Sequence, residues 1–185
     1  VELKARKEVL VSAGTFGSPQ LLQLAGIGGE ADLKPHVIAV RHELPGVGQN
    51  LQDHPDVVLC YRSTDNSLPG FSVGGGVKMG KALLDYARNK TGPFASNFAE
   101  AGAFLKTDAS LARPDIQLHS VISMVDNHNR SLHWGHGFSC HVCVLRPKSI
   151  GTVSLYSADP LAPPRIDPKL LSHDDDVQTL LKGYP

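Results

Sequence analysis

The chain has 185 residues, of which 41% are hydrophobic and 19% charged, so it can bury a core and is not a disordered chain. Eighteen basic residues balance eighteen acidic ones, which argues against a nucleic-acid binder that neutralises phosphates. The sequence has no apolar run long enough for a transmembrane helix, and its three cysteines favour a reducing compartment, hence a cytoplasmic location.

The first predicted elements are a strand and a helix. The apolar run 8–13 predicts a buried strand of a parallel sheet, because both faces of such a strand are covered. Ser18 and Pro19 then indicate a helix start, and Gly26 is placed to end the helix in a left-handed conformation. This is half of a β-α-β unit, so we expect exposed apolar surface that drives oligomer formation or leaves residues 1–28 partly disordered.

The middle of the chain alternates short elements with loops. The predicted elements are a helical turn at 30–34, strands at 37–42 and 56–61, a loop at 66–76 and a helix at 77–89. Gly92 and Pro93 are expected to end this helix.

The second half changes character, because short runs with a period of two recur between turn residues. These runs, at 98–105, 115–122, 137–145 and 151–156, predict an antiparallel sheet with one solvated face. Ser172 and the three aspartates after His173 predict a final helix. The fold class is therefore α+β: an antiparallel sheet domain flanked by helices, preceded by a truncated strand–helix piece of an α/β domain.

Cys140 and Cys143 form a C-x-x-C pattern, which is found in redox pairs and in half-sites for zinc. On a strand, however, residues three apart point to opposite faces, so the two sulfurs diverge. Cys60 is the only other cysteine. We therefore interpret these residues as buried, inert cysteines.

Four histidines, His128, His133, His136 and His141, cluster in the sequence. No carboxylate at an obvious spacing could orient them, so we expect no metal and interpret the segment as a loop bordering a substrate pocket. No dinucleotide-binding fingerprint, P-loop or hydrolase nucleophile motif is present.

Acidic residues at two places are candidates for chemistry. Asp53, His54 and Asp56 lie within four residues, where the histidine could be a base or an oriented partner, or could form a loop salt bridge and cap. Both interpretations stay open. Glu100, within an apolar strand, either faces solvent by simple alternation or lines a cavity.

Residues 14–28 resemble the second signature of the glucose–methanol–choline flavoprotein oxidoreductases, with Ala25 where the signature expects serine. Further blocks are similar to segments of the choline dehydrogenase and alcohol dehydrogenase branch of that family; they lie at 44–54, 92–102, 146–153 and 164–168. The resemblance covers essentially the whole chain, with its blocks in the family's order.

The resemblance implies an enzyme that oxidises choline or another primary alcohol and passes a hydride to FAD. In the family, the glycine-rich FAD loop lies near the N-terminus and the catalytic histidine near the C-terminus, and neither matches this chain. We therefore expect an internal fragment that is inactive alone and binds FAD only within the full-length enzyme. Residues 1–52 would be the end of the FAD-binding domain and 53–185 an incomplete substrate-binding domain. The expected partners are the alcohol and the rest of the FAD domain. For the full-length enzyme, peripheral contact with a membrane is left open.

By resemblance, Ala13 and Gly14 lie where the strand of the FAD domain approaches the cofactor, and a glycine there allows close backbone approach. Asp56, two residues after His54, lies where choline-oxidising relatives place a glutamate that pairs with the substrate's ammonium group. Because aspartate is one methylene shorter, a general primary alcohol stays open beside choline.

His54, Phe98 and Glu100 are further candidates for substrate binding or pocket walls, and Trp134 is either an aromatic wall or part of the core. A second hypothesis is a stand-alone module that binds a small cation or a protein partner without FAD.

Overall fold

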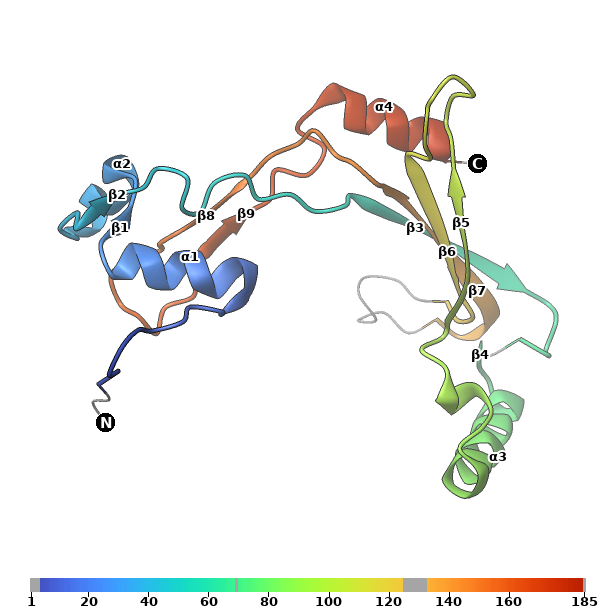
Figure 1. The fold of residues 1–185 in the computed structure, drawn as a ribbon. Helices are drawn as coiled ribbons and strands as arrows, with labels where there is room; N and C mark the ends of the chain where they lie inside the picture. The colour runs from blue at the N-terminus through green and yellow to red at the C-terminus, as the bar shows by residue number, and fades with distance from the viewer. Residues whose placement is uncertain (1–3, 69, 125–132, 185) are drawn as a thin grey trace. The chain divides into compact units, whose positions relative to one another are not determined.

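The computed structural model describes residues 4–68, 70–124 and 133–184 and divides the chain into two compact units (Figure 1). The first unit comprises Val1–Asp53 and Lys148–His173, and the second comprises His54–Pro147 and Asp174–Pro185. The return of the segment after Pro147 to the first unit was not indicated by the sequence. The assignment of residues 1–52 and 53–185 to a cofactor domain and a substrate domain stays a prediction.

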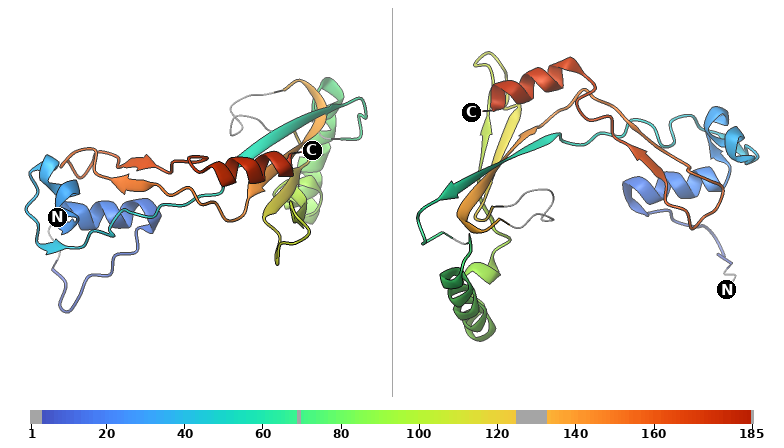
Figure 2. Two further views of the ribbon diagram at one scale, coloured as in Figure 1. Left: turned by 90° about the horizontal axis from the view of Figure 1, so that it is seen from above. Right: turned by 180° about the vertical axis from the view of Figure 1, so that it is seen from behind.

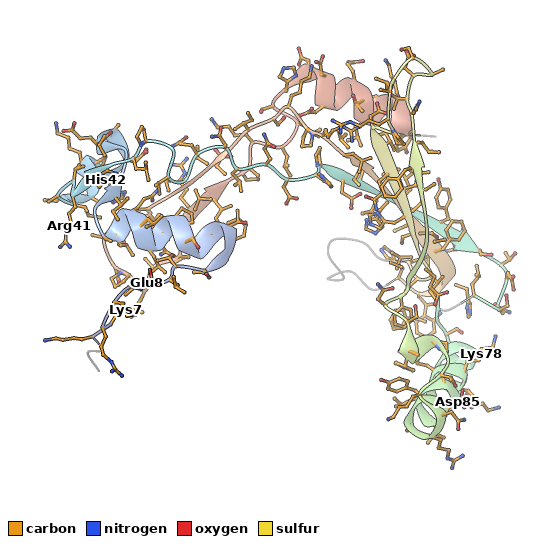
Figure 3. The ribbon with its side chains drawn as sticks, in the orientation of Figure 1. Lys7, Glu8, Arg41, His42, Lys78 and Asp85 are labelled. Carbon is orange, nitrogen blue, oxygen red and sulfur yellow. The ribbon has the colours of Figure 1, made fainter. Side chains whose placement is uncertain are left out.

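The first unit consists of short elements. They are α1 (Gly14–Leu24), β1 (Ile27–Gly28), α2 (Glu30–Leu33), the 3₁₀ helix η1 (Lys34–His36), β2 (His42–Glu43), β8 (Thr152–Ser154) and β9 (Arg165–Asp167). Strand β1 pairs in parallel with β2, and β8 pairs antiparallel with β9. Figure 3 shows Arg41 and His42 at the β2 edge of this unit and Lys7 and Glu8 on its N-terminal segment.

The predicted strand at 8–13 is not formed, which corrects the sequence-based expectation. Its apolar side chains are exposed, with Val9 at 77% and Leu10 at 80%. A parallel strand exists only through hydrogen bonds to neighbouring strands, and no strand among the described residues pairs with this segment. Helix α1 also begins earlier than expected, at Gly14, so that Pro19 lies inside it. Gly26 follows the helix with φ +82°, as predicted.

Backbone contacts around one glutamine hold this unit together. Gln23, on α1, is 1% exposed, and its Nε2 donates to the carbonyl oxygens of Val47 and Val153 at 3.4 and 3.1 Å. The amide of Val153 donates to the carbonyl of Gly48 at 2.7 Å. Gly48 has φ +78°, and a Cβ there would lie 2.1 Å from the Val153 oxygen. Only glycine fits this close approach of loop and strand.

The second unit is built on one antiparallel sheet. Its elements are β3 (Asp56–Ser63), β4 (Gly70–Phe71), α3 (Val73–Asn89), η2 (Pro93–Ala95), β5 (Ala99–Leu105), β6 (Ile116–Val121), β7 (Gly135–Val144) and α4 (Asp174–Gly183). The strand order is β3-β7-β6-β5, with β4 also paired to β7. Helix α4 lies across one end of the sheet and α3 lies beyond the other end, beside β4 (Figures 1 and 2). Strands β5, β6 and β7 confirm that the alternating runs at 98–105, 115–122 and 137–145 form one antiparallel sheet, whereas the run at 151–156 forms β8 of the first unit, which corrects that part of the prediction.

The two faces of the sheet differ. One face carries Ile116, Val142 and Val144, which are at most 3% exposed and pack with Leu180 of α4. Alternation places the polar side chains of β3, β6 and β7 on the opposite face. The core thus lies under α4, and the other face of the sheet is open to functional side chains.

Helix α3 includes three glycines that the sequence placed in a loop. It begins at Val73 because the Ser72 hydroxyl accepts a hydrogen bond from the amide of Gly75 at 2.9 Å, which caps the helix. The predicted strand at 37–42 is also largely absent, because Val37 adopts a left-handed conformation after η1 and only its end joins β2. Among the described residues, no helix combines the length and apolar character needed to cross a bilayer.

Candidate functional site

A cavity of about 670 Å³ lies in the second unit, on the face of the sheet opposite the α4 core. Its walls come from β4, the start of α3, the segment before β5, and strands β6 and β7. Most of the lining is apolar: Phe71, Met79, Phe98 and Trp134 supply large side chains. The volume and the mostly apolar walls suit a small organic molecule.

The polar end of the cavity is a pair of histidines. His119 on β6 lies directly opposite His141 on β7 in the strand register, and the two rings stack with centroids 4.4 Å apart. His141 Nδ1 lies 2.6 Å from Oδ2 of Asp56, which starts the neighbouring strand β3. Three strands therefore bring these side chains together from distant parts of the sequence.

The carboxylate of Asp56 fixes which nitrogen of His141 can accept a hydrogen bond. A carboxylate oxygen accepts, so Nδ1 of His141 donates this hydrogen bond, and in the neutral form of the ring the lone pair is on Nε2. That Nε2 atom is buried and, like Nδ1 of His119, has no hydrogen-bond partner among the described residues. The two histidines at the polar end of the cavity therefore each have a buried ring nitrogen without a hydrogen-bond partner among the described residues.

Burial shifts the pKa values of His119 and Cys143 on this face of the sheet. The pKa of His119 is lowered, first by burial and then by the nearby His141, while Asp56 opposes the shift. His119 is therefore a neutral imidazole at neutral pH. On the same face, burial raises the pKa of the Cys143 thiol, and Asp56 adds to that effect, so this cysteine stays protonated.

Asp56, His119 and His141 are also the group of described residues whose ligand atoms lie close enough to hold a metal ion. Their arrangement does not favour one. An imidazole binds a metal in the plane of its ring, and two rings stacked at an angle of 16° cannot both direct lone pairs in their planes at one ion. The expectation that no metal binds stays a prediction.

Of the predicted substrate-site residues, the structure brings two to the cavity region. Phe98 lines the cavity and has a left-handed backbone with φ +65°, a conformation that concentrates at functional sites in non-glycine residues. Asp56 reaches the cavity through His141. His54 lies in the loop before β3 and Glu100 lies exposed beside a bulge in β5, and neither lines the cavity.

Trp134 lines the cavity and is 70% exposed. Of the two alternatives for this residue, it is therefore an aromatic wall of the cavity and not part of the core. His136 is buried and structural: its Nδ1 lies 2.7 Å from the carbonyl of Leu68, and its Nε2 lies 2.9 Å from the hydroxyl of Ser72. It thereby holds the N-terminal cap of α3. His128, from the predicted histidine cluster, lies outside the described residues.

The C-x-x-C pattern lies on β7, where alternation places Cys140 and Cys143 on opposite faces as predicted. None of the three cysteines forms a disulfide. Of the pair expected to be buried, Cys143 is buried and Cys140 is half-buried; Cys60 is exposed.

The predicted cofactor-binding residues lie at the start of α1 in the first unit. Gly14 has φ +77°, and a Cβ added there would meet no atom within 4 Å. The amide of Ala13 donates to the Ser18 hydroxyl at 3.0 Å. The exposed backbone at a helix N-terminus fits close approach of a cofactor that carries phosphate or carbonyl oxygens. Their role in binding it stays a prediction.

The first unit also has a hollow of about 410 Å³ along α1. Thr15, Ser18 and Leu22 of the helix line one side, and loop 47–52 with Val153 lines the other. No pattern in the sequence indicates this hollow, because loop 47–52 is tied by hydrogen bonds to the segment of β8, about a hundred residues later in the chain.

Comparisons with known proteins agree on one family. A family model described as GMC oxidoreductase matches residues 2–56. An alcohol dehydrogenase [acceptor] of Pseudomonas putida is 39% identical over 176 residues, covering 95% of this chain and 32% of that protein. An oxygen-dependent choline dehydrogenase of Brucella anthropi is 40% identical over 179 residues, covering 94% and 32%.

Among solved structures, a formate oxidase matches with a TM-score of 0.83 and 28% identity over 97% of this chain and 36% of that one. A structure on FAD modification in the formate oxidase of Aspergillus oryzae matches equally well. The chain thus spans about a third of the length of the curated relatives it matches. Family model, sequence relatives and structural neighbours coincide, and the chain belongs to the glucose–methanol–choline (GMC) family of FAD-dependent oxidoreductases.

Proposed function

We propose that this chain is the substrate-holding part of a flavoenzyme that oxidises a primary alcohol to an aldehyde. The observation that carries the proposal is the cavity of the second unit, whose apolar walls lead to two histidines, each with a buried ring nitrogen that has no hydrogen-bond partner among the described residues. Such an arrangement suits a ligand with one hydroxyl group and an apolar body. The alcohol and choline dehydrogenases among the relatives support an alcohol as the ligand.

In this proposal, the substrate hydroxyl donates to Nε2 of His141 or Nδ1 of His119. Asp56 acts as a positioning residue, because it holds the proton of His141 on Nδ1 and so keeps Nε2 available as an acceptor. Neutral His119 adds a second acceptor or donor in the same place. Fixing the hydroxyl in this way fixes the carbon that bears it, and positioning of this kind lowers a reaction barrier substantially.

The cavity favours an uncharged alcohol over choline. Among the described residues that line it, none carries a carboxylate that could pair with a quaternary ammonium group. The carboxylate of Asp56 is occupied by His141 and lies outside the lining. Phe71, Met79 and Trp134 instead offer apolar surface for an alkyl or aryl group.

Ala13 and Gly14, with the hollow along α1, would contribute to the FAD site from the first unit. Bound FAD supplies the acceptor for the hydride that leaves the alcohol carbon. The glycine-rich FAD loop and the proton-abstracting histidine would come from sequence beyond these residues, so we expect the 185-residue chain alone to hold an alcohol without oxidising it.

A longer protein that contains these residues and the family's remaining segments tests the proposal. We expect it to be yellow with bound FAD and to oxidise medium-chain or aryl alcohols faster than choline with an artificial electron acceptor. His141→Ala in this protein should raise KM and lower kcat, while Cys60→Ser, on an exposed residue outside the cavity, should change neither. A colourless protein, or one that oxidises only choline, would contradict the proposal.

A further inference from the structure

A second, smaller cavity lies beside the one described above, against helix α3. Its volume is about 130 Å³, and we call it the α3 pocket. Leu68, Ala82 and Pro93 line the α3 pocket and do not line the larger cavity. They come from the loop before β4, from α3 and from η2, which lie together beyond one end of the sheet (Figure 1). The α3 pocket is therefore built within the second unit.

The lining of the α3 pocket is mostly apolar. Two residues with polar side chains, Ser67 and Lys78, contribute to it. The ammonium group of Lys78 donates to the carbonyl oxygen of Asn66 at 2.6 Å, and Figure 3 shows this side chain projecting outward from α3. The charge of Lys78 is thus engaged by the loop, and the remaining lining suits a hydrocarbon chain.

The two cavities share a wall. Four residues line both of them: Gly70, Gly75, Met79 and Phe98. The glycines contribute only backbone, which is tightly packed, because a Cβ on Gly75 would lie 2.2 Å from the carbonyl oxygen of Gly70. The side chains that separate the cavities are therefore those of Met79 and Phe98. Methionine is unbranched and adapts its shape, so the rigid ring of Phe98 is the stronger barrier.

The backbone of Phe98 is held from both sides. Its amide donates to the hydroxyl of Ser96 at 3.0 Å, and its carbonyl oxygen accepts from the amide of Ile122 at 3.1 Å. Between these bonds the residue adopts φ +65°, which a non-glycine residue keeps only where its surroundings fix it. The ring of Phe98 therefore starts from an anchored backbone.

The strand register places this wall farther along the sheet than the histidines. Ala99, next to Phe98, lies opposite Val121, whereas His119 lies opposite Gly102. An alkyl chain that begins at the two histidines and runs along the sheet toward α3 thus reaches the ring of Phe98.

We propose that the ring of Phe98 sets the length of the alcohols that the larger cavity accepts, and that the α3 pocket behind it takes the end of a longer alkyl chain once the ring is removed. This inference rests on the proposed function, because the histidines must hold the hydroxyl end. Each methylene group that leaves water adds about fourfold to affinity. In the unchanged chain the gain ends where the alcohol meets Phe98, and a variant without the ring extends it.

Binding of 1-octanol and 1-dodecanol to the 185-residue chain tests the inference, with quenching of Trp134 fluorescence as the measurement. Glycine tolerates φ +65° better than phenylalanine, so Phe98→Gly removes the ring without adding backbone strain. In this variant we expect the preference for 1-dodecanol over 1-octanol, taken as the ratio of the two dissociation constants, to increase at least about tenfold. The ratio cancels any change in how the hydroxyl end is held.

Two further variants connect the gain to the α3 pocket. Ala82→Leu, added to Phe98→Gly, places a larger side chain in that pocket and should return the ratio to within about threefold of the unchanged chain. The matched control is Phe104→Ala, which removes an exposed ring of β5 that lines neither cavity, and it should leave the ratio within about twofold. Amide chemical shifts of Leu68 and Ala82 in Phe98→Gly should change with 1-dodecanol and not with 1-octanol.

The outcomes separate this inference from the proposed function. If 1-octanol binds but Phe98→Gly leaves the ratio unchanged, the inference is overturned and the proposed function stands. An equal gain in Phe104→Ala, or a gain that Ala82→Leu does not reduce, would also overturn it, because the α3 pocket would not be the cause. If 1-octanol shows no saturable binding to the unchanged chain, the proposed function is contradicted and the inference falls with it.

Discussion

The contacts that stabilise each of the two units internally are of different kinds. The second unit has a continuous sheet with an apolar core of Ile116, Val142 and Val144 under α4. The first unit has short strands of two or three residues, and its tight contacts are backbone hydrogen bonds around Gln23 and Gly48. The second unit therefore gains stability from burying apolar side chains, whereas the tight contacts of the first unit require a residue without a side chain at Gly48.

A second contrast lies within the sheet of the second unit. Its α4 face is apolar and packed, and its other face carries Asp56, His119 and His141 beside a cavity. Because alternate residues of the same strands serve the two faces, stability and ligand binding can be changed separately.

The largest effect is expected on the packed face. Ile116→Ala removes a side chain that is 0% exposed and packs with Val142 and Leu180, and should lower the free energy of unfolding of the second unit by about 2–5 kcal/mol. Trp134, the only tryptophan, reports this unfolding by fluorescence in a denaturant titration. A loss below about 1 kcal/mol would show that the α4 core does not stabilise the unit.

The next effect tests the tight backbone contacts of the first unit. Gly14 and Gly48 have nearly equal φ values, +77° and +78°, so alanine at either position has the same conformational cost of about 1–2 kcal/mol. At Gly48 the new Cβ also meets the Val153 oxygen at 2.1 Å, whereas at Gly14 it meets nothing within 4 Å.

Gly48→Ala should therefore destabilise the first unit by about 2 kcal/mol more than Gly14→Ala. Hydrogen exchange at the amides of Gly151 and Val153, which donate to Leu51 and Gly48, measures the difference. Equal exchange rates in the two variants would refute the close approach of loop 47–52 to β8.

On the open face, the expected effect is on binding more than on stability. Asp56→Asn removes the carboxylate that fixes the proton of His141, and should weaken alcohol binding about tenfold, or ~1.4 kcal/mol. Asp53→Asn, in the loop before β3, is the matched control and should leave binding within about twofold. Quenching of Trp134 fluorescence by 1-octanol measures both. If both variants lost affinity equally, a specific role for Asp56 would be excluded.

The smallest effect is a dependence of stability on pH. Because the pKa of His119 is lowered from 6.5 in the folded chain, the unfolded chain binds the proton more readily. The stabilisation is therefore complete above about pH 6.5 and declines as the pH falls below that value toward the lowered pKa. His119→Gln should flatten this decline by a fraction of a kcal/mol, seen in denaturant titrations at pH 5 and 7.5. An unchanged slope would assign the decline to other groups.

Most strands of the sheet, and the fact that one face is open, could be predicted from the sequence, because alternation with a period of two is a local signal. It was insufficient for residues 8–13, since an apolar run indicates burial only where neighbouring strands exist to cover it. It also missed the start of α3, because three consecutive glycines indicate a loop unless the cap formed by Ser72, and its support by His136, is known.

The candidate site could be predicted only in part, because its residues are brought together by contacts between distant segments of the chain. The sequence grouped His54 with Asp56 because they are near in the chain, but Asp56 pairs with His141, 85 residues away. His119 and His141 become neighbours only through the register of β6 and β7, which short-range patterns do not determine. The one available signal was that each histidine sits on an alternating run predicted to join one antiparallel sheet.

Titration of the ¹⁵N-labelled chain with 1-octanol, followed by amide and imidazole chemical shifts, tests directly whether the open face of the sheet holds an alcohol. We expect saturable shifts at Phe71, Phe98 and the ring nitrogens of His119 and His141, with the resonances of the first unit unchanged. Saturable shifts confined to residues outside this cavity, or no saturable shift at all, would contradict the claim that the open face of the sheet holds the alcohol.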